Sequence, residues 1–255
     1  MPERIIFALQ KGGVGKTTST VASAEILAAA GYRVLVADMD PQGNATRMLT
    51  GESIYTFSGH TIMEAIRTGD ADPYIHKVKE NLDLIPAEDH LAAFSRYIYT
   101  SRVENPYAAL KRLLEPVDGR YDFVFVDVGP TLGDTLVNAI VYADHIIIPV
   151  DLGDLAMDAM VRFMEFVDES RAEGHTTAKT IGILLTMKDG RTKYEREVAE
   201  GIRSAYGDLV FNSEIHRRVS IKEMSASGVN LEADSMKYYF SLVEEIINRI
   251  GGKTA

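Results

Sequence analysis

Apolar runs that suit buried strands alternate with helical stretches along most of the chain. Several of these runs are continuous rather than alternating, as at 34–37 and 123–126. Continuous apolar strands are typical of parallel sheets that are buried on both faces. The pattern predicts strands over 4–9, 33–38, 82–86, 123–127, 145–150, 180–186 and 209–212.

Between these strands, apolar residues recur with the spacing of helices. The predicted helices cover 17–30, 61–67, 89–99, 106–114, 132–142, 155–173, 194–206, 221–226 and 235–250. Alternating strands and helices predict a doubly wound α/β fold, with a mostly parallel sheet and helices on both faces. We expect a single domain over 1–255, with no helix-turn-helix domain before it and a surface insertion over the irregular segment 51–80.

The composition limits the cellular compartments in which the protein is expected. No stretch approaches the roughly 18 apolar residues of a membrane span, and the early first strand leaves no room for a signal peptide. The chain has no cysteine, which excludes disulfides, thiolate metal sites and iron–sulfur clusters. We therefore expect a cytoplasmic protein.

The most informative segment is 10–18, Gln-Lys-Gly-Gly-Val-Gly-Lys-Thr-Thr, directly after the first apolar run. Glycines let backbone N–H groups approach phosphate oxygens, and the N-terminus of the following helix favours an anion. Lys16 suits the β- and γ-phosphates, and the Thr17 hydroxyl suits Mg²⁺. The nucleotide-binding residues are predicted to be Lys11, Gly12, Gly13, Val14, Gly15, Lys16, Thr17 and Thr18.

Two details depart from the usual phosphate loop. The glycine expected five residues before the Gly-Lys pair is Gln10, and an extra lysine, Lys11, stands at the start of the loop. A second cation suggests either more negative charge to hold or a site completed by another subunit.

Carboxylates follow two other strands, at Asp38, Asp40 and Asp127. The carboxyl ends of parallel strands lie at one edge of a sheet, where ligands bind. We expect Thr17, Asp38 and Asp127 to hold Mg²⁺ and Asp40 to orient the attacking water. A helix cap or turn is the structural alternative for each aspartate.

Three segments carry a resemblance to the ParA-type partition ATPases, of the deviant phosphate-loop class that includes MinD. They are Lys-Gly-Gly-Val-Gly-Lys-Thr-Thr (11–18), Asp-Met-Asp-Pro-Gln-Gly-Asn-Ala-Thr (38–46) and Asp-Val-Gly-Pro-Thr-Leu-Gly (127–133). The likeness extends to 184–192 and 215–219 and spans about residues 4–250. Gly129 departs from the pattern, because ParA proteins usually have proline there, and the segment 150–158 is more acidic than its counterpart in the family.

The resemblance implies a mechanism. Lys11 reaches the nucleotide of a partner subunit in an ATP-bound homodimer, Lys16 contacts the phosphates within its own subunit, Thr17 binds Mg²⁺ and Asp40 serves hydrolysis. ATP then acts as a dimerisation switch with slow hydrolysis as its timer. The dimer binds DNA nonspecifically on the nucleoid, and a ParB-type protein stimulates hydrolysis to segregate or position plasmid, chromosome or other cargo.

The charge distribution agrees only in part with the DNA binding that the resemblance implies. The net charge is −10, and all of it falls on residues 1–179, whereas residues 180–255 carry 11 basic and 11 acidic residues. The pattern of basic residues is also compatible with a solvated, mixed-charge helix. The resemblance places the DNA contacts in this C-terminal part, with the candidates Lys188, Arg191, Lys193, Arg196, Arg217, Arg218 and Lys222.

Two alternatives remain. A MinD-like membrane-associated ATPase would use a C-terminal amphipathic helix, but Glu244 and Glu245 lie on the polar face of 237–250 and oppose anionic lipid. We therefore expect a packing helix and no membrane partner. A metabolic ATP-dependent enzyme of the amidoligase type would share the fold without needing Lys11.

Overall fold

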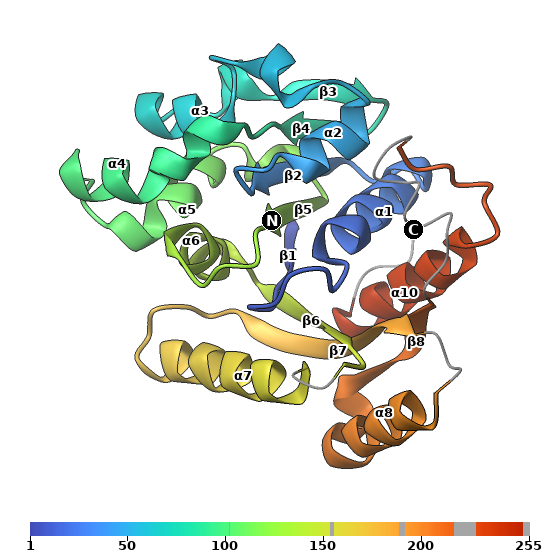
Figure 1. The fold of residues 1–255 in the computed structure, drawn as a ribbon. Helices are drawn as coiled ribbons and strands as arrows, with labels where there is room; N and C mark the ends of the chain where they lie inside the picture. The colour runs from blue at the N-terminus through green and yellow to red at the C-terminus, as the bar shows by residue number, and fades with distance from the viewer. Residues whose placement is uncertain (102, 154–155, 189–191, 217–227, 252–255) are drawn as a thin grey trace.

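The computed structural model describes residues 1–101, 103–153, 156–188, 192–216 and 228–251. Its strands form one eight-stranded sheet in the order β3-β4-β2-β5-β1-β6-β7-β8 (Figure 1). All neighbouring strands are parallel except β3 and β4. The strands are β1 Glu3–Phe7, β2 Val34–Met39, β3 His76–Lys79, β4 Leu82–Ile85, β5 Phe123–Val128, β6 His145–Asp151, β7 Lys179–Lys188 and β8 Val210–His216.

Helices cover both faces of the sheet, which confirms the doubly wound α/β fold. On one face α1, α2 and α10 enclose one apolar core, and on the other face the helices from α3 to α8 enclose a second core. The helices are α1 Lys16–Ala29, α2 Asn44–Thr50, α3 Ile62–Thr68, α4 Phe94–Thr100, α5 Ala109–Leu114, α6 Asp134–Tyr142, α7 Ala156–Ala172, α8 Lys193–Tyr206 and α10 Met236–Arg249.

Two short elements differ from the sequence-based expectation. β3 lies inside the segment 51–80, which was expected to be an irregular insertion, and it pairs with β4 through a turn at Asn81, whose φ is 61°. Its sequence, His-Lys-Val-Lys, contains a single apolar residue, so periodicity gives no signal for it. α2 is not among the predicted helices; it begins after Gly43, whose backbone is left-handed. The helix predicted over 221–226 lies outside the described residues.

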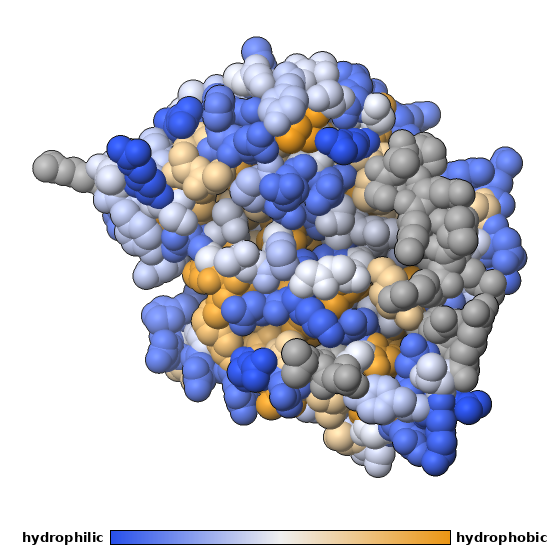
Figure 2. All heavy atoms as spheres, viewed as in Figure 1, coloured by the Kyte–Doolittle hydropathy of each residue, from blue (hydrophilic) through white to orange (hydrophobic). Residues whose placement is uncertain are grey.

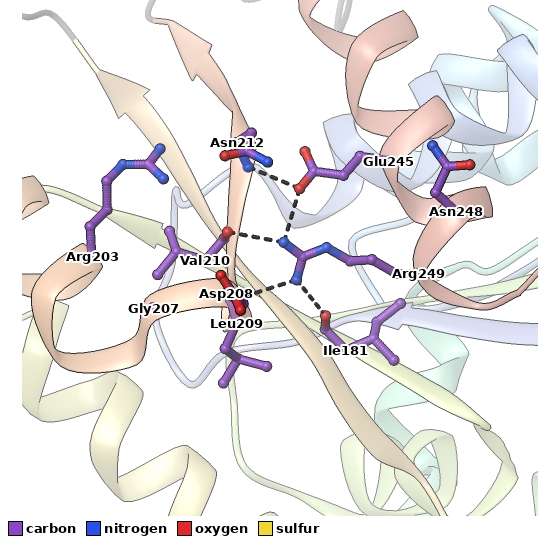
Figure 3. Close-up of a pocket in the computed structure, with 10 residues that line it drawn as sticks. All are labelled: Ile181, Arg203, Gly207, Asp208, Leu209, Val210, Asn212, Glu245, Asn248 and Arg249. Atoms are coloured by element: carbon purple, nitrogen blue, oxygen red, sulfur yellow. Dashed lines mark hydrogen bonds and ion pairs between the residues drawn. The ribbon is translucent and has the colours of Figure 1, made fainter.

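Arg249 fastens the end of α10 to the sheet (Figure 3). Its guanidinium donates to the carbonyl oxygens of Ile181 and Val210 at 2.8 and 2.9 Å. It also lies over the ring of Phe211, 4.0 Å from the ring centre. Because hydrogen bonds to a charged donor are stronger than neutral ones, this contact joins α10, β7 and β8 firmly.

Glu245, one turn earlier on α10, completes this attachment. Its carboxylate accepts hydrogen bonds from the backbone N–H groups of Asn212 and Ser213 at 2.9 and 3.0 Å, and it pairs with Arg249 at 2.9 Å. Burial alone would raise the pKa of Glu245, but these hydrogen bonds together hold it below its usual value. Glu245 is therefore part of the packing of α10, as the sequence analysis expected for this helix.

The apolar face of α10 is covered within the protein. Met236, Tyr239, Leu242, Val243 and Ile246 are buried in the core that α10 shares with α1 and β8. None of the helices in the described part of the chain is long and apolar enough to span a bilayer.

Candidate nucleotide site

Four neighbouring strands bring the candidate residues to one edge of the sheet. The loop that carries Lys11 and Lys16 follows β1, Asp40 follows β2, Asp127 lies at the end of β5, and Asp151 ends β6. Because β2, β5, β1 and β6 are consecutive in the sheet, these residues meet there. A cavity of about 610 Å³ opens at this edge, lined by Gly12, Gly13, Gly15, Lys16, Thr17, Thr18, Asp40, Gln42, Asn44, Arg47, Met48, Val128, Pro130 and Met187.

The loop between β1 and α1 is shaped to hold an anion. Gly13 and Gly15 have φ values of 75° and 84°, a backbone region that favours glycine. Gly15 is the N-cap of α1 and has no side chain with which to accept hydrogen bonds from the first turn. The N–H groups at the start of α1 are therefore left for a ligand in the cavity. The Thr186 hydroxyl donates to the Val14 carbonyl at 2.9 Å and so ties the loop to β7.

Lys16 lies inside the cavity and is 6% exposed. Its ammonium donates to the backbone carbonyl of Lys11 at 2.8 Å. Burial lowers the pKa of Lys16, although the charges of Asp127 and Asp40 oppose this. A partly desolvated ammonium with a single carbonyl acceptor is well suited to a phosphate oxygen.

Lys11 takes a different direction and is not among the residues that line the cavity. Its ammonium forms an ion pair with Asp151 at 2.6 Å, and both side chains are about a quarter exposed, at 26% and 28%. The two lysines of the loop therefore occupy separate environments. Sequence reasoning missed Asp151, although it belongs to the acidic segment 150–158 noted above.

Asp38 is fully buried and its oxygens are already engaged. One oxygen accepts hydrogen bonds from the backbone N–H and the hydroxyl of Thr46 at 2.9 and 2.8 Å, and the other accepts from the backbone N–H of Asp40 at 3.1 Å. Burial raises the pKa of Asp38 to about 6. These contacts favour an anchoring role, since Asp38 joins β2 to α2; its role as a Mg²⁺ ligand stays a prediction.

Asp127 is the direct neighbour of Asp38 across the paired strands β2 and β5. It is fully buried, and neither carboxylate oxygen accepts a hydrogen bond of regular geometry in the part of the chain that the structure describes, although the nearby Thr17 hydroxyl favours its ionised form. Burial and then the charge of Asp38 raise the pKa of Asp127 well above its usual range. Such a group calls for a compensating cation.

The donor set fits Mg²⁺, a hard cation that takes one or two protein oxygens together with phosphate. Asp127 and the Thr17 hydroxyl are the protein groups at hand, and Thr17 lines the cavity. Within the described ranges no group of three or more acidic, histidine or cysteine side chains could hold a metal alone. The metal would therefore share its ligands with the nucleotide.

Asp40 is 7% exposed and lines the cavity. One of its oxygens accepts a hydrogen bond from the backbone N–H of Gln42 at 3.0 Å. A Cβ placed on Gly129 would lie 3.4 Å from the Asp40 carboxylate. The glycine that departs from the ParA pattern thus leaves open space beside this aspartate.

Three further residues at the site were not among the predicted site residues. Thr46 anchors Asp38, Arg47 lines the cavity, and Met187 does so from a left-handed backbone with φ of 56°. Thr46 ends the quoted segment 38–46 and Arg47 comes directly after it, so a helix starting at Asn44 would have indicated both.

The basic residues proposed for DNA are only partly covered by the structure. Arg191, Arg217, Arg218 and Lys222, together with the side chain of Lys188, lie outside the described residues. Lys193 pairs with Glu197 at 3.2 Å on α8, and Arg196 is exposed on the same helix.

Comparison with known proteins places these features in context. A protein family described as an AAA domain matches residues 3–180. The chromosome partitioning protein ParA of Caulobacter vibrioides is 31% identical over 259 residues, covering 97% of this chain and 95% of that protein. The chromosome-partitioning ATPase Soj of Treponema pallidum is 31% identical over 262 residues, covering 98% and 99%.

Among solved structures, cobyrinic acid a,c-diamide synthase of Mycobacterium smegmatis with a bound ATP analogue and magnesium is 26% identical. It superposes with a TM-score of 0.86 over 98% of this chain and 96% of that one. The fold is thus shared with a protein whose solved structure holds an ATP analogue and magnesium.

Proposed function

Because this chain belongs to the ParA-type partition ATPases of the MinD/ParA superfamily, and is thus a positioning ATPase that uses ATP and Mg²⁺, we propose that ATP switches it from a monomer to a DNA-binding homodimer. The observation that carries the proposal is the position of Lys11, which belongs to the phosphate loop but does not line the cavity of its own subunit. A cation in that position is available to the nucleotide of a second subunit.

Within one subunit, the residues of this chain divide the work. The loop N–H groups and Lys16 bind and orient the phosphates, and Thr17 and Asp127 hold Mg²⁺, which supplies charge compensation when bound. Asp40 orients the attacking water.

The output of the switch is the part of the proposal that depends most on the relatives of this chain. We propose nonspecific DNA binding through the C-terminal basic residues, stimulation of hydrolysis by a ParB-type protein, and action on the nucleoid in the cytoplasm, all within one ATPase domain. Support comes from the named relatives and from the charge balance, which is −10 over 1–179 and zero over 180–255. Lys or Arg contacts to phosphates give sequence-independent, salt-sensitive affinity.

The test uses Asp40→Ala, which should trap the ATP-bound form. With ATP and Mg²⁺ we expect a dimer in gel filtration and retardation of DNA of any sequence at low salt. Lys11→Ala in the same background should remain a monomer that does not bind DNA. An Asp40→Ala protein that stays monomeric and binds no DNA at low salt would overturn the proposal.

A second candidate is a metabolic ATP-dependent enzyme, which the match to the diamide synthase favours. It would hydrolyse ATP during amide formation and would not need Lys11. Full ATPase activity in monomeric Lys11→Ala protein would support this candidate. A MinD-like membrane switch is less favoured, because the apolar face of α10 is already buried against α1 and β8.

A further inference from the structure

A second cavity, of about 470 Å³, lies between α6 and α7, away from the nucleotide site. It shares no lining residue with the nucleotide cavity. Both helices begin near the strand ends that carry the site, and the groove is lined by their later turns, from Val137 to Val141 and from Phe166 to Glu173. We call this cavity the α6–α7 groove.

The floor of the α6–α7 groove is apolar. Val137, Ile140 and Val141 line it from α6, at the i, i+3 and i+4 spacing of one helix face, and Phe166 lines it from α7. Val137, Val141 and Phe166 are only partly buried. Figure 2 shows hydrophobic residues gathered at the surface between these two helices. Exposed apolar surface of this kind marks a binding site more often than chance.

Polar groups in the floor are already used within the protein. The Ser170 hydroxyl donates to the carbonyl of Phe166 at 2.8 Å, and the Thr176 hydroxyl donates to the carbonyl of Ile140 at 2.7 Å. The floor therefore offers apolar contact rather than free hydrogen-bonding groups, so its ligand must bring an apolar face.

The rim of the groove is acidic. Glu169 and Glu173 are exposed, and no lysine or arginine is among the lining residues. Glu173 is 3.2 Å from His175, and both side chains are 66% exposed. The Glu169 carboxylate has no hydrogen bond or ion pair with any residue that the structure describes. A ligand with cations beside its apolar face would match this rim.

Aromatic side chains extend the surface on the side of α6. Tyr107 lines the groove and is 48% exposed, and Tyr99 beside it is 54% exposed. The Tyr99 hydroxyl donates to Asp134 at 2.9 Å, which fixes its ring at the start of α6. Exposed tyrosines are enriched among the residues that dominate binding energy at protein interfaces.

From these features we propose that the α6–α7 groove binds a cationic amphipathic helix of a partner protein. The lining residues 166, 169 and 170 of α7, together with Glu173 directly after its end, form one face about 10 Å long. Two helices that present such faces form a groove for a third helix, whose apolar side chains fill the floor. Lysine or arginine residues at the edge of its apolar face pair with Glu169 and Glu173.

The experiment measures binding of two fluorescein-labelled 16-residue helical peptides by anisotropy at low salt. Both carry leucines on one face; one carries lysines on the other face and the second carries glutamates. We expect the lysine peptide to bind at least tenfold more tightly than the glutamate peptide. The double variant Glu169→Lys/Glu173→Lys, and separately Val141→Ser, should each weaken the lysine peptide at least tenfold.

Matched controls exclude binding through net charge alone. Glu197→Lys/Glu200→Lys on α8, which changes the net charge as much as the groove double variant, and Phe240→Ser on α10 alter exposed residues outside the groove and should leave peptide binding unchanged. All variants should retain basal ATP hydrolysis, which reports on folding and on the nucleotide site separately. Equal binding of the two peptides, or a groove variant that binds like the wild type, would overturn the proposal.

Discussion

The ammonium of Lys11 lies 2.6 Å from the carboxylate of Asp151 in the same subunit. This ion pair occupies the lysine that we propose for the partner's nucleotide. Dimerisation must therefore exchange one anionic partner of Lys11 for another, and the strength of the intrasubunit pair opposes the dimer.

We predict that Asp151→Asn strengthens ATP-dependent dimerisation. A partly exposed ion pair contributes about 0.2–1 kcal/mol, and each homodimer breaks two such pairs, so the dimer dissociation constant should fall by up to roughly 30-fold. Analytical ultracentrifugation with ATP and Mg²⁺ measures this. Asp158→Asn, on the exposed surface of α7, is the control. If Asp151→Asn dimerises as poorly as Lys11→Ala, Asp151 acts within the dimer instead.

Asp127→Asn should stabilise the nucleotide-free protein. It replaces a buried carboxylate that accepts no hydrogen bond of regular geometry among the described residues and that faces Asp38. Removing such an unsatisfied charge is worth about 1–3 kcal/mol, visible as a higher melting temperature without ligand. The same variant should lose the extra stabilisation that ATP gives in the presence of Mg²⁺. A lower melting temperature in the absence of ligand would contradict this.

Thr46→Val should loosen the connection between β2 and α2. The Thr46 hydroxyl donates to Asp38 and also accepts from the backbone N–H of Ala87 at 3.0 Å, so valine leaves both groups buried without this partner. We expect a loss of about 1–3 kcal/mol of unfolding free energy in a denaturant titration. Thr46→Ser, which keeps the hydroxyl, should retain most of the stability; equal losses in both variants would point to packing instead.

Gly129→Ala tests the space beside Asp40. The added Cβ would lie 3.4 Å from the Asp40 carboxylate, where it limits water and restricts the side chain. We expect ATP hydrolysis to fall severalfold while ATP binding stays within twofold, as measured by steady-state turnover and titration; misplacing a catalytic group by about 1 Å can cost up to 100-fold. Gly133→Ala, which would meet nothing within 4 Å, is the control.

The lowered pKa of Glu245 predicts how the stability of the folded protein changes in acid. Its pKa in the folded protein lies below the usual value of 4.5, so its ionised form contributes stability that is fully present above 4.5 and is lost as the pH falls through the folded pKa. Glu245→Gln should be less stable at pH 7, and the gap to wild type should shrink as the pH drops below 4.5. Glu244→Gln, which removes an exposed carboxylate from the same helix, is the control.

Long buried elements were predictable from the sequence because their signal is local. The runs that became β2 and β5 are continuous and apolar, and each strand lies within about two residues of its predicted range. The phosphate loop was predictable because its glycines and Lys16 must occur in one order next to a strand and a helix. The family assignment, the fold, the ATPase activity and the use of ATP and Mg²⁺ are all confirmed by the relatives.

What could not be predicted depends on contacts between distant residues. The pairing of Lys11 with Asp151 joins positions 140 apart in sequence, and no pattern near Lys11 indicates its partner. The engagement of one Asp38 oxygen by Thr46 likewise follows from the start of α2, which sequence periodicity did not show. β3 forms only because β4 lies beside it.

The strand order also has a consequence for synthesis of the protein. β1 is translated well before its two neighbours in the sheet, β5 and β6, which end at Val128 and Asp151. The loop after β1 thus emerges long before the strands that flank it, and pairing of distant segments is slow. A nascent chain should gain affinity for ATP only after β6, which ends at Asp151, has been translated.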